Sequence, residues 1–459
     1  MRSGWFLQDL MTSIADQGRN LLPAAIFGSE DTESGLQQLI EALTSNRGEA
    51  SGVVIARQLL RHYRLLEDDA QRSAFFRYLA RRFQPDTVRT ERAAAAYLED
   101  PSPLTLEALQ AAVESPLQEF FRRLNLAPGG TAEIVHMRED LLRLKAGHDE
   151  LERVDRDMVH LLHSWFNRGF LVLRPIDWQT PAAILDKIIE YEAVHAIQGW
   201  QDLRRRLEPN DRRCFAFFHP SMGDEPLIFV EVALMSDIPA TIQAVLEEEA
   251  KTGDARDLTT AVFYSISNCQ AGLRGISFGN FLIKQVVEDL LSELPNLKTF
   301  VTLSPVPRFA SWLSDVRADP DGVLSDADRK RLDTLDRPGW FDDADAVADL
   351  QPLLLGLASH YFLEARSPSG RVIDPVGRFH LGNGARLERV NMTANPSPRG
   401  LTEAHGLMVN YLYDPAQIER NHEAFANEGT VAVSRPVRAH LKALATQPSA
   451  RAPAKVPAA

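Results

Sequence analysis

The chain has 459 residues, of which 44% are hydrophobic and 25% are charged, a balance typical of a globular protein with two or more domains. Its 63 acidic residues outnumber its 50 basic ones, and the net charge of -13 argues against nucleic acid as a partner, although it allows a local basic pocket for a phosphorylated ligand. Two cysteines, Cys214 and Cys269, exclude a disulfide framework and a cysteine-rich zinc site.

The sequence shows no membrane or targeting signal. No apolar run approaches the roughly 18 residues that suggest a membrane span. Residues 1–18 lack the apolar core and the small-residue cleavage site of a secretory signal, and residues 455–459 do not form a peroxisomal Ser-Lys-Leu signal. We therefore expect a cytoplasmic protein that makes no contact with a membrane.

The first part of the chain has the pattern of helices. In 53–66 and again in 151–166, apolar residues recur at intervals of three to four, which predicts amphipathic helices. Proline and glycine at 101–103 and 128–130 separate such segments. We predict that residues 1–168 form an all-helical bundle domain that serves packing or oligomerisation.

The pattern changes at Gly169, where short apolar runs begin to alternate with helical ones. A helix is predicted from about residue 280 to 294. Strands are predicted at 170–174, 227–234, 261–266, 299–303, 386–392 and 406–413. This mixture favours an α+β protein, in which a mixed α/β sheet domain of residues 169–446 follows the helical bundle. The Ala- and Pro-rich residues 447–459 are predicted to be a disordered tail.

A glycine-rich turn, 270–279, lies between the predicted strand 261–266 and the helix that follows. Glycines let backbone N–H groups approach an anion, and a helix N-terminus adds unpaired N–H groups and positive potential. The spacing fits neither the Walker loop nor the dinucleotide fingerprint. From the residues alone, tight packing and anion binding both stay open.

The turn resembles the acyl-CoA pyrophosphate loop of the GCN5-related N-acetyltransferase (GNAT) fold, with Arg274, Ser277 and Gly279 on its pattern and Ser277 in place of the first glycine. The resemblance implies that strands 261–266 and 299–303 are parallel and splay apart, so that the pantetheine arm enters between them. The residues expected to bind CoA are Gln270, Gly272, Arg274, Gly275, Ser277, Gly279 and Arg308.

Longer motifs resemble the malonyl-CoA decarboxylase family, in the same order and at the expected separations. They are 171–178, 212–235, 263–290, 303–313, 379–391 and 397–413. The resemblance implies a helical domain followed by a GNAT-like sheet domain, and conversion of malonyl-CoA to acetyl-CoA and CO2 by a carboxy-lyase. It also implies a homo-oligomer, either a dimer or a tetramer.

Such a decarboxylation makes limited demands on the protein. The thioester carbonyl accepts the electrons left by CO2 as an enolate, so we expect no metal and no other cofactor. The protein must place donors at the thioester oxygen, hold the carboxylate in line with the carbonyl π-system, and deliver a proton to the carbanion.

The family resemblance makes Ser304 and His380 the catalytic pair, with Ser304 orienting the carboxylate or enolate and His380 handling the proton. It places Ser265 and Tyr413 near the acyl end of the site. The residues alone also allow structural roles: Ser304 as a Ser-Pro strand terminator, His380 as a half-buried histidine and Tyr413 as an ordinary sheet tyrosine. The pair is far apart in sequence, so a meeting of the two side chains has to be seen in a structure.

Two other functions are compatible with the residues. A GNAT-type acyltransferase would move an acyl group from CoA to an amine and would need a base near the thioester. A non-catalytic CoA sensor joined to a helical assembly module would not need Ser304 and His380. Release of CO2 from malonyl-CoA without an acceptor distinguishes the lyase from both.

Overall fold

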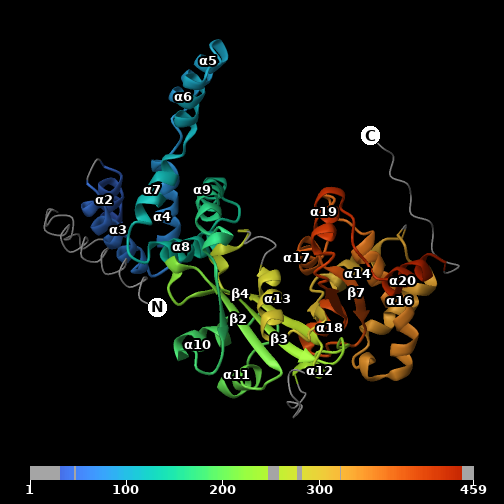
Figure 1. The fold of residues 1–459 in the computed structure, drawn as a ribbon. Coiled ribbons are helices and arrows are strands. Elements are labelled where there is room, and N and C mark those ends of the chain that lie inside the picture. The colour runs from blue at the N-terminus through green and yellow to red at the C-terminus, as the bar shows by residue number, and fades with distance from the viewer. Residues whose placement is uncertain (1–31, 46–47, 247–257, 277–281, 321, 447–459) are drawn as a thin grey trace. The chain divides into compact units, whose positions relative to one another are not determined.

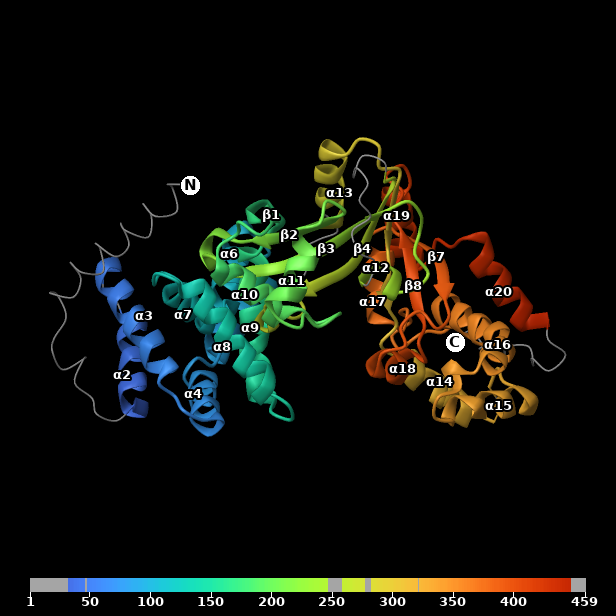
Figure 2. The same ribbon diagram turned by 90° about the horizontal axis from the view of Figure 1, so that it is seen from below.

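The computed structural model describes residues 32–45, 48–246, 258–276, 282–320 and 322–446 (Figures 1 and 2). The chain divides into two compact units. Unit 1 comprises the described residues of Met1–Val172, Phe217–Leu227 and Asn268–Phe278, and unit 2 those of Leu173–Ala216, Ile228–Ser267 and Gly279–Ala459. The predicted class, helices followed by a mixed sheet, is confirmed. The predicted boundary between residues 168 and 169 stays a prediction, and the predicted tail of 447–459 lies outside the described residues.

The described part of unit 1 consists mainly of helices, six of which contribute residues to one apolar core. The helices are α2 (Thr32–Thr44), α3 (Glu49–Arg64), α4 (Asp69–Arg82), α5 (Thr87–Glu99), α6 (Pro103–Val113), α7 (Pro116–Leu124), α8 (Gly130–Leu144) and α9 (Asp149–Trp165). The stripes predicted in 53–66 and 151–166 fall on α3 and α9, and both stripes contribute buried residues to the core. The predicted break at 101–103 falls where α5 gives way to α6: Pro103 is the first residue of α6, and Ser102 makes a capping box with Thr105.

The pair α5 and α6 differs from the other helices of unit 1. The two helices pack on each other, and Figure 1 shows them extending away from α7 and α4. Helix α5 contains no buried residue. Leu98 and Leu104 are 80% and 75% exposed. This helical hairpin therefore carries an apolar surface that the monomer does not cover.

Within the described residues, eight strands form one sheet in the order β1-β2-β3-β4-β5-β8-β6, and β7 pairs with β8. The strands are β1 (Val172–Ile176), β2 (Arg212–Phe218), β3 (Pro226–Met235), β4 (Thr260–Asn268), β5 (Thr299–Thr302), β6 (Ser304–Pro305), β7 (Arg386–Asn391) and β8 (Met408–Leu412). Every predicted strand has a counterpart. The first is displaced: the prediction of 170–174 is wrong at both ends, because Phe170 ends a 3-10 turn and β1 continues through Pro175. A proline is tolerated there because β1 is an edge strand.

The remaining helices join and cover these strands. They are α10 (Ala182–Tyr191), α11 (Trp200–Leu207), α12 (Gln243–Leu246), α13 (Leu282–Glu293), α14 (Phe309–Ala318), α15 (Asp326–Leu332), α16 (Ala344–Leu363), α17 (Pro375–Gly382), α18 (Pro398–Ala404), α19 (Ile418–Glu428) and α20 (Arg435–Thr446). In Figure 2, β7 and β8 lie side by side, and α16 and α20 pack on each other and against β7. Across the described residues, none of the helices has the length and apolarity needed to cross a bilayer.

The parallel ladder between β4 and β5 ends early. Its last partners are Phe263 and Thr302, after which the N–H of Leu303 donates to the Phe263 carbonyl. Strand β4 continues to Asn268, whereas Ser304 and Pro305 pair with β8 instead. The parallel pairing predicted for these strands is confirmed. Ser304 does not end the second of them, however, because β5 ends at Thr302 and Ser304 begins β6.

Candidate active site

Ser304, His380 and Tyr413 meet in unit 2. Ser304 Oγ lies 3.1 Å from His380 Nε2, and the other ring nitrogen, Nδ1, lies 2.8 Å from the Tyr413 hydroxyl. Ser304 begins β6, His380 is in the last turn of α17, and Tyr413 directly follows β8. Ser304 is 6% exposed and His380 is 3% exposed. Three residues singled out in the sequence therefore form one buried hydrogen-bonded group.

Helix α17 places His380 because both ends of the helix are fixed. At its start, Asp374 Oδ1 accepts the N–H of Gly377 (2.7 Å), and Pro375 occupies a position where a proline is favourable. Just beyond its end, Gly384 has a φ of +82°, and an added Cβ would collide with the carbonyl oxygen of Ile418. The ring of His380 stacks on Tyr411 of β8, with centroids 4.6 Å apart.

Thr302 sets the direction of the hydrogen bonds. The Ser304 hydroxyl donates to Thr302 Oγ1 at 2.9 Å, so Ser304 Oγ is left to accept the Nε2–H of His380. Nδ1 then accepts the hydroxyl proton of Tyr413. Thr302 Oγ1 also accepts the N–H of Tyr411 (3.2 Å), and Asn410 Nδ2 donates to the Thr302 carbonyl at 2.9 Å. Thr302 was not among the residues expected from the sequence, although its place two residues before Ser304, on the same side of an extended chain, was a usable signal.

Burial keeps His380 and Tyr413 uncharged. It lowers the pKa of His380 from its ordinary value of 6.5 to about 3, and it raises the pKa of Tyr413 well above 10. The imidazole is therefore neutral at physiological pH and donates through Nε2. This arrangement can donate hydrogen bonds and protons to an oxyanion or carbanion beside Ser304. It does not activate Ser304 as a nucleophile, because no base accepts the serine proton.

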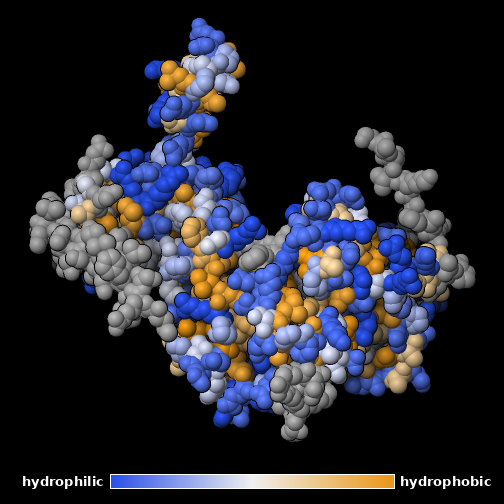
Figure 3. All heavy atoms as spheres, in the orientation of Figure 1, coloured by the Kyte–Doolittle hydropathy of each residue, from blue (hydrophilic) through white to orange (hydrophobic). Residues whose placement is uncertain are grey.

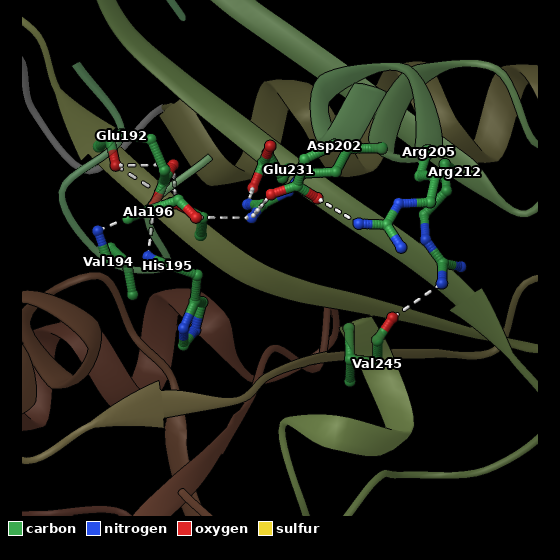
Figure 4. A network of polar contacts seen from close by, with 12 residues as sticks. Glu192, Val194, His195, Ala196, Asp202, Arg205, Arg212, Glu231 and Val245 are labelled. Atoms are coloured by element: carbon green, nitrogen blue, oxygen red, sulfur yellow. Dashed lines mark hydrogen bonds and ion pairs between the residues drawn. The ribbon is translucent and has the colours of Figure 1, made fainter. Parts of the chain in front are cut away.

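Ser265 belongs to a different group of contacts. Its hydroxyl donates to Glu192 Oε2 at 2.7 Å and lies 3.2 Å from Ser267 Oγ. Glu192 Oε1 in turn accepts the N–H groups of Val194 (2.8 Å) and His195 (2.6 Å), as Figure 4 shows. The structure thus leaves Ser265 outside the hydrogen bonds that join the other three residues. Ser265 and Ser304 nevertheless each lie two residues beyond the last partners of the β4–β5 ladder, Phe263 and Thr302. The role of Ser265 at the acyl end of the site stays a prediction.

Glu192 is next to a second buried ionic group that the sequence analysis also missed. Arg206 donates to Glu231 Oε2 (3.0 Å) and to Asp202 Oδ2 (3.3 Å). Burial raises the pKa of Glu231 to about 8, although the charge of Arg206 opposes this shift. A single glutamate in the apolar run of β3 was the available signal, because a buried acid needs a partner. This group ties α11 to β3.

The predicted CoA-binding turn is partly described. The side chain of Gln270 is buried, and its amide donates to the Pro226 carbonyl at 3.0 Å. An added Cβ on Gly272 would collide with the Val135 carbonyl, so packing requires this glycine. Gly275 has a φ of +84° and open space around it. Tight packing and anion binding were the two explanations open for the glycines of this turn, and tight packing explains Gly272.

The other predicted CoA-binding residues differ in how far they are described. Arg274 and Arg308 are exposed, the latter at the start of α14. Ser277, Gly279 and the predicted first residues of the helix lie outside the described residues, and α13 is described from Leu282. Within the described part of the chain, no three or more His, Cys, Asp or Glu residues are grouped so that they could hold a metal ion.

Comparison with known proteins gives a consistent result. Residues 169–451 match the family model of the malonyl-CoA decarboxylase C-terminal domain, and residues 83–166 match that of the N-terminal domain. The mitochondrial malonyl-CoA decarboxylase of Anser anser anser is 32% identical over 413 residues, which are 83% of this chain and 82% of the relative. The mitochondrial malonyl-CoA decarboxylase of Rattus norvegicus is 34% identical over 381 residues, which are 76% of this chain and 77% of the relative.

Solved structures are also similar. The malonyl-CoA decarboxylase of Rhodopseudomonas palustris has 55% sequence identity and a TM-score of 0.85, covering 89% of this chain and 99% of that one. The malonyl-CoA decarboxylase of Cupriavidus metallidurans has 36% identity and a TM-score of 0.67, with coverages of 89% and 98%.

The buried imidazole predicts a pH-dependent stability. Between pH 6.5 and about 3, the unfolded chain binds a proton at His380 that the folded chain excludes, so stability is lost as the pH falls. Relative to His380→Gln, the wild type should lose up to about 1.4 kcal/mol of unfolding free energy for each pH unit below 6.5. Denaturant unfolding at pH 7.5, 6.5 and 5.5 measures this difference. His163→Gln, at an exposed residue of α9, is the control, and parallel curves for the wild type and His380→Gln would contradict the prediction.

Proposed function

The chain belongs to the malonyl-CoA decarboxylase family and is by that membership a carboxy-lyase, and we propose that Ser304, His380 and Tyr413 carry out its reaction. The reaction converts malonyl-CoA to acetyl-CoA and CO2. The observation that carries the assignment of residues is the buried hydrogen-bonded group itself, in which a neutral imidazole donates toward the serine hydroxyl.

Ser304 binds the oxygen atoms on which charge lies or develops. As the bond between the malonyl carboxylate and the α-carbon breaks, its electrons enter the thioester carbonyl and form an enolate. The Ser304 hydroxyl can turn from Thr302 toward the substrate, either to the carboxylate or to the enolate oxygen. A donor held in a site that excludes water stabilises such charge more strongly than water does.

His380 supplies the proton that completes acetyl-CoA. When Nε2 gives its proton to the α-carbon, Nδ1 takes the proton that Tyr413 already donates to it. The ring thus stays neutral while its tautomer changes. After the product leaves, water in the emptied site returns a proton to Nε2 and the Nδ1 proton goes back to Tyr413, which restores the starting tautomer. This relay assigns Tyr413 a catalytic role that an ordinary sheet tyrosine does not have.

We also propose that no cofactor takes part. A decarboxylase usually recruits a cofactor to accept the electron pair, but the thioester of this substrate accepts the pair itself. The CoA end is assigned to the turn of residues 270–276 and to the exposed cations Arg274 and Arg308, together with Ser277 and Gly279. The positive-φ glycine of that turn and its exposed arginine support this assignment.

Single substitutions test the roles of the pair. Ser304→Ala and His380→Gln should each lower kcat by about 10²- to 10⁴-fold, because each removes a donor used in the transition state. Turnover is measured as release of labelled CO2 from malonyl-CoA labelled in its free carboxylate. The assay contains no acyl acceptor and is run both with and without EDTA. Ser359→Ala, which removes a buried hydroxyl of α16 bonded to the Leu355 carbonyl, is the matched control.

Each alternative has its own outcome in this assay. A wild type that releases no CO2 but transfers the malonyl group to an added amine, with release of CoA, would be an acyltransferase. A wild type that binds CoA tightly but turns over no short acyl-CoA would be a sensor. Near-normal turnover by either variant would remove that residue from the mechanism.

We propose that the protein forms a homo-oligomer, a dimer or tetramer, through unit 1. The exposed apolar residues of the α5–α6 hairpin support this, since such a surface is stabilised by burial against a second copy. Figure 3 shows hydrophobic residues among polar ones on this hairpin. The most exposed are Val88, Leu98, Leu104 and Val113.

Charge substitution on the hairpin tests the assembly. Leu98→Glu combined with Leu104→Glu should reduce the mass measured by light scattering after gel filtration, because the new charges cannot be buried without a partner. Arg92→Glu, at an exposed residue of α5 outside the apolar set, is the control and should keep the wild-type mass. A monomeric wild type, or an unchanged mass of the double variant, would contradict the proposal.

We further propose that the protein works in the cytoplasm without nucleic acid as a partner. The scarcity of cysteine fits a reducing compartment, and the net charge of -13 disfavours binding to a polyanion.

A further inference from the structure

Arg138 is a buried cation in unit 1 that the proposed chemistry does not use. It lies on α8, is 2% exposed, and its guanidinium donates to three oxygen atoms. Two of them are backbone carbonyls of the glycine-rich turn, that of Gly272 at 2.6 Å and that of Arg274 at 2.9 Å. The third is Asp155 Oδ1 on α9, at 2.7 Å.

The carboxylate of Asp155 orients this guanidinium. Its second oxygen, Oδ2, accepts from Lys145 at 2.7 Å, so the aspartate is itself held from two sides. A charge-assisted contact inside the protein is stronger and more directional than one at the surface. Helices α8 and α9 thus supply a rigid clamp for two peptide groups of the turn.

The turn also rests directly on α8. Gly272 approaches the Val135 carbonyl so closely that no other residue fits there. On the other side, Gln270 donates to Pro226, and the N–H of Cys269 donates to the Leu227 carbonyl at 2.9 Å. The position of residues 269–274 is therefore set by contacts within unit 1.

The clamp has a consequence for the next peptide group. In a trans peptide the carbonyl and the following N–H point in opposite directions, so binding of the Arg274 carbonyl to Arg138 turns the N–H of Gly275 away from α8. Gly275 is exposed and has a φ of +84°. Among the described residues, no backbone carbonyl accepts its N–H. An exposed N–H of this kind, beside the side chain of Arg274, is suited to a phosphate oxygen.

We propose that Arg138 and Asp155 are positioning residues for the nucleotide end of CoA: they fix the backbone of the turn so that the Gly275 N–H presents itself to a phosphate oxygen. The inference rests on the proposed function, in which this turn binds the CoA phosphates. It gives the helical part of the chain an indirect role in substrate recognition. Neither residue touches the substrate.

Comparison of two substrates tests this role. Malonyl-CoA uses the nucleotide end, whereas malonyl-pantetheine lacks the phosphates. Arg138→Met should raise the KM for malonyl-CoA and the Kd for CoA, measured by calorimetry, by about 10-fold, which corresponds to about 1.4 kcal/mol. Its kcat with malonyl-CoA, and its kcat/KM with malonyl-pantetheine, should stay within about 2-fold of the wild type, because the reacting groups are untouched.

Arg143→Met is the matched control. Arg143 is also on α8 and pairs with Asp69 and Asp140, but it makes no contact with the turn among the described residues. All constants should stay at wild-type values in this variant. Equal losses with both substrates in Arg138→Met would show a general structural effect and overturn the proposal, as would an unchanged Kd for CoA.

Asp155→Asn serves as a second variant if Arg138→Met does not fold. It keeps the guanidinium but weakens its orientation, and should shift the KM for malonyl-CoA in the same direction by about 3-fold. An unchanged ratio of the two substrates' kcat/KM values in this variant would overturn the proposal. A wild type that binds CoA but releases no CO2 from either substrate would instead remove the proposed function, and the CoA affinities would still test the clamp.

Discussion

The hydrogen bond between His380 Nε2 and Ser304 Oγ depends on where the parallel ladder of β4 and β5 stops. Had the two strands stayed paired beyond Phe263 and Thr302, Ser304 would lie inside a continuous parallel ladder. The chain instead leaves β5 after Thr302, and Ser304 pairs with Val409 of β8. Strand β8 then places Tyr411 against the face of the imidazole, and Tyr413, directly after the strand, meets Nδ1 with its hydroxyl. One change of strand partner thus assembles the group.

Burial of this group matters as much as its geometry. An imidazolium at this place would lose its hydration without gaining a counter-ion, and the pKa of His380 near 3 expresses that cost. Neutrality suits a reaction in which a carboxylate disappears as CO2 and an enolate forms briefly. In the proposed mechanism, neutral donors stabilise that charge where it develops, without binding the initial carboxylate so tightly that the ground state is stabilised as well.

The sequence was informative where local physics decides the outcome. Apolar residues at helical spacing located α3 and α9, and the β-branched runs located β3, β4 and β5, because these elements are defined by the face that they bury. Ser304 and His380 could be named only through the family resemblance. Their meeting could not be derived, because it depends on α17 and on the change of strand partner, both of which are tertiary features.

The residues that were missed share one property. Thr302, Asp374 and Glu192 are short or medium-length polar side chains whose partners come from other elements or from helix ends. Nothing in their immediate neighbours distinguishes them from ordinary strand or loop residues. Glu231 was the exception, because an acid within an apolar strand signals a buried partner before that partner is known.

The glycines of the turn show why a motif needs a structure before it has a physical meaning. Gly272 and Gly275 stand three residues apart and look equivalent in the sequence. Gly272 is required because α8 leaves no room for a side chain, whereas Gly275 is required by its backbone conformation and faces open space. Of the two, Gly272 is buried and Gly275 is exposed, so the proposed phosphate contact falls to Gly275, and the packing of Gly272 on α8 helps to fix its position. Packing and the proposed anion binding are therefore complementary roles for one turn, and Arg138 connects them by binding the Gly272 and Arg274 carbonyls.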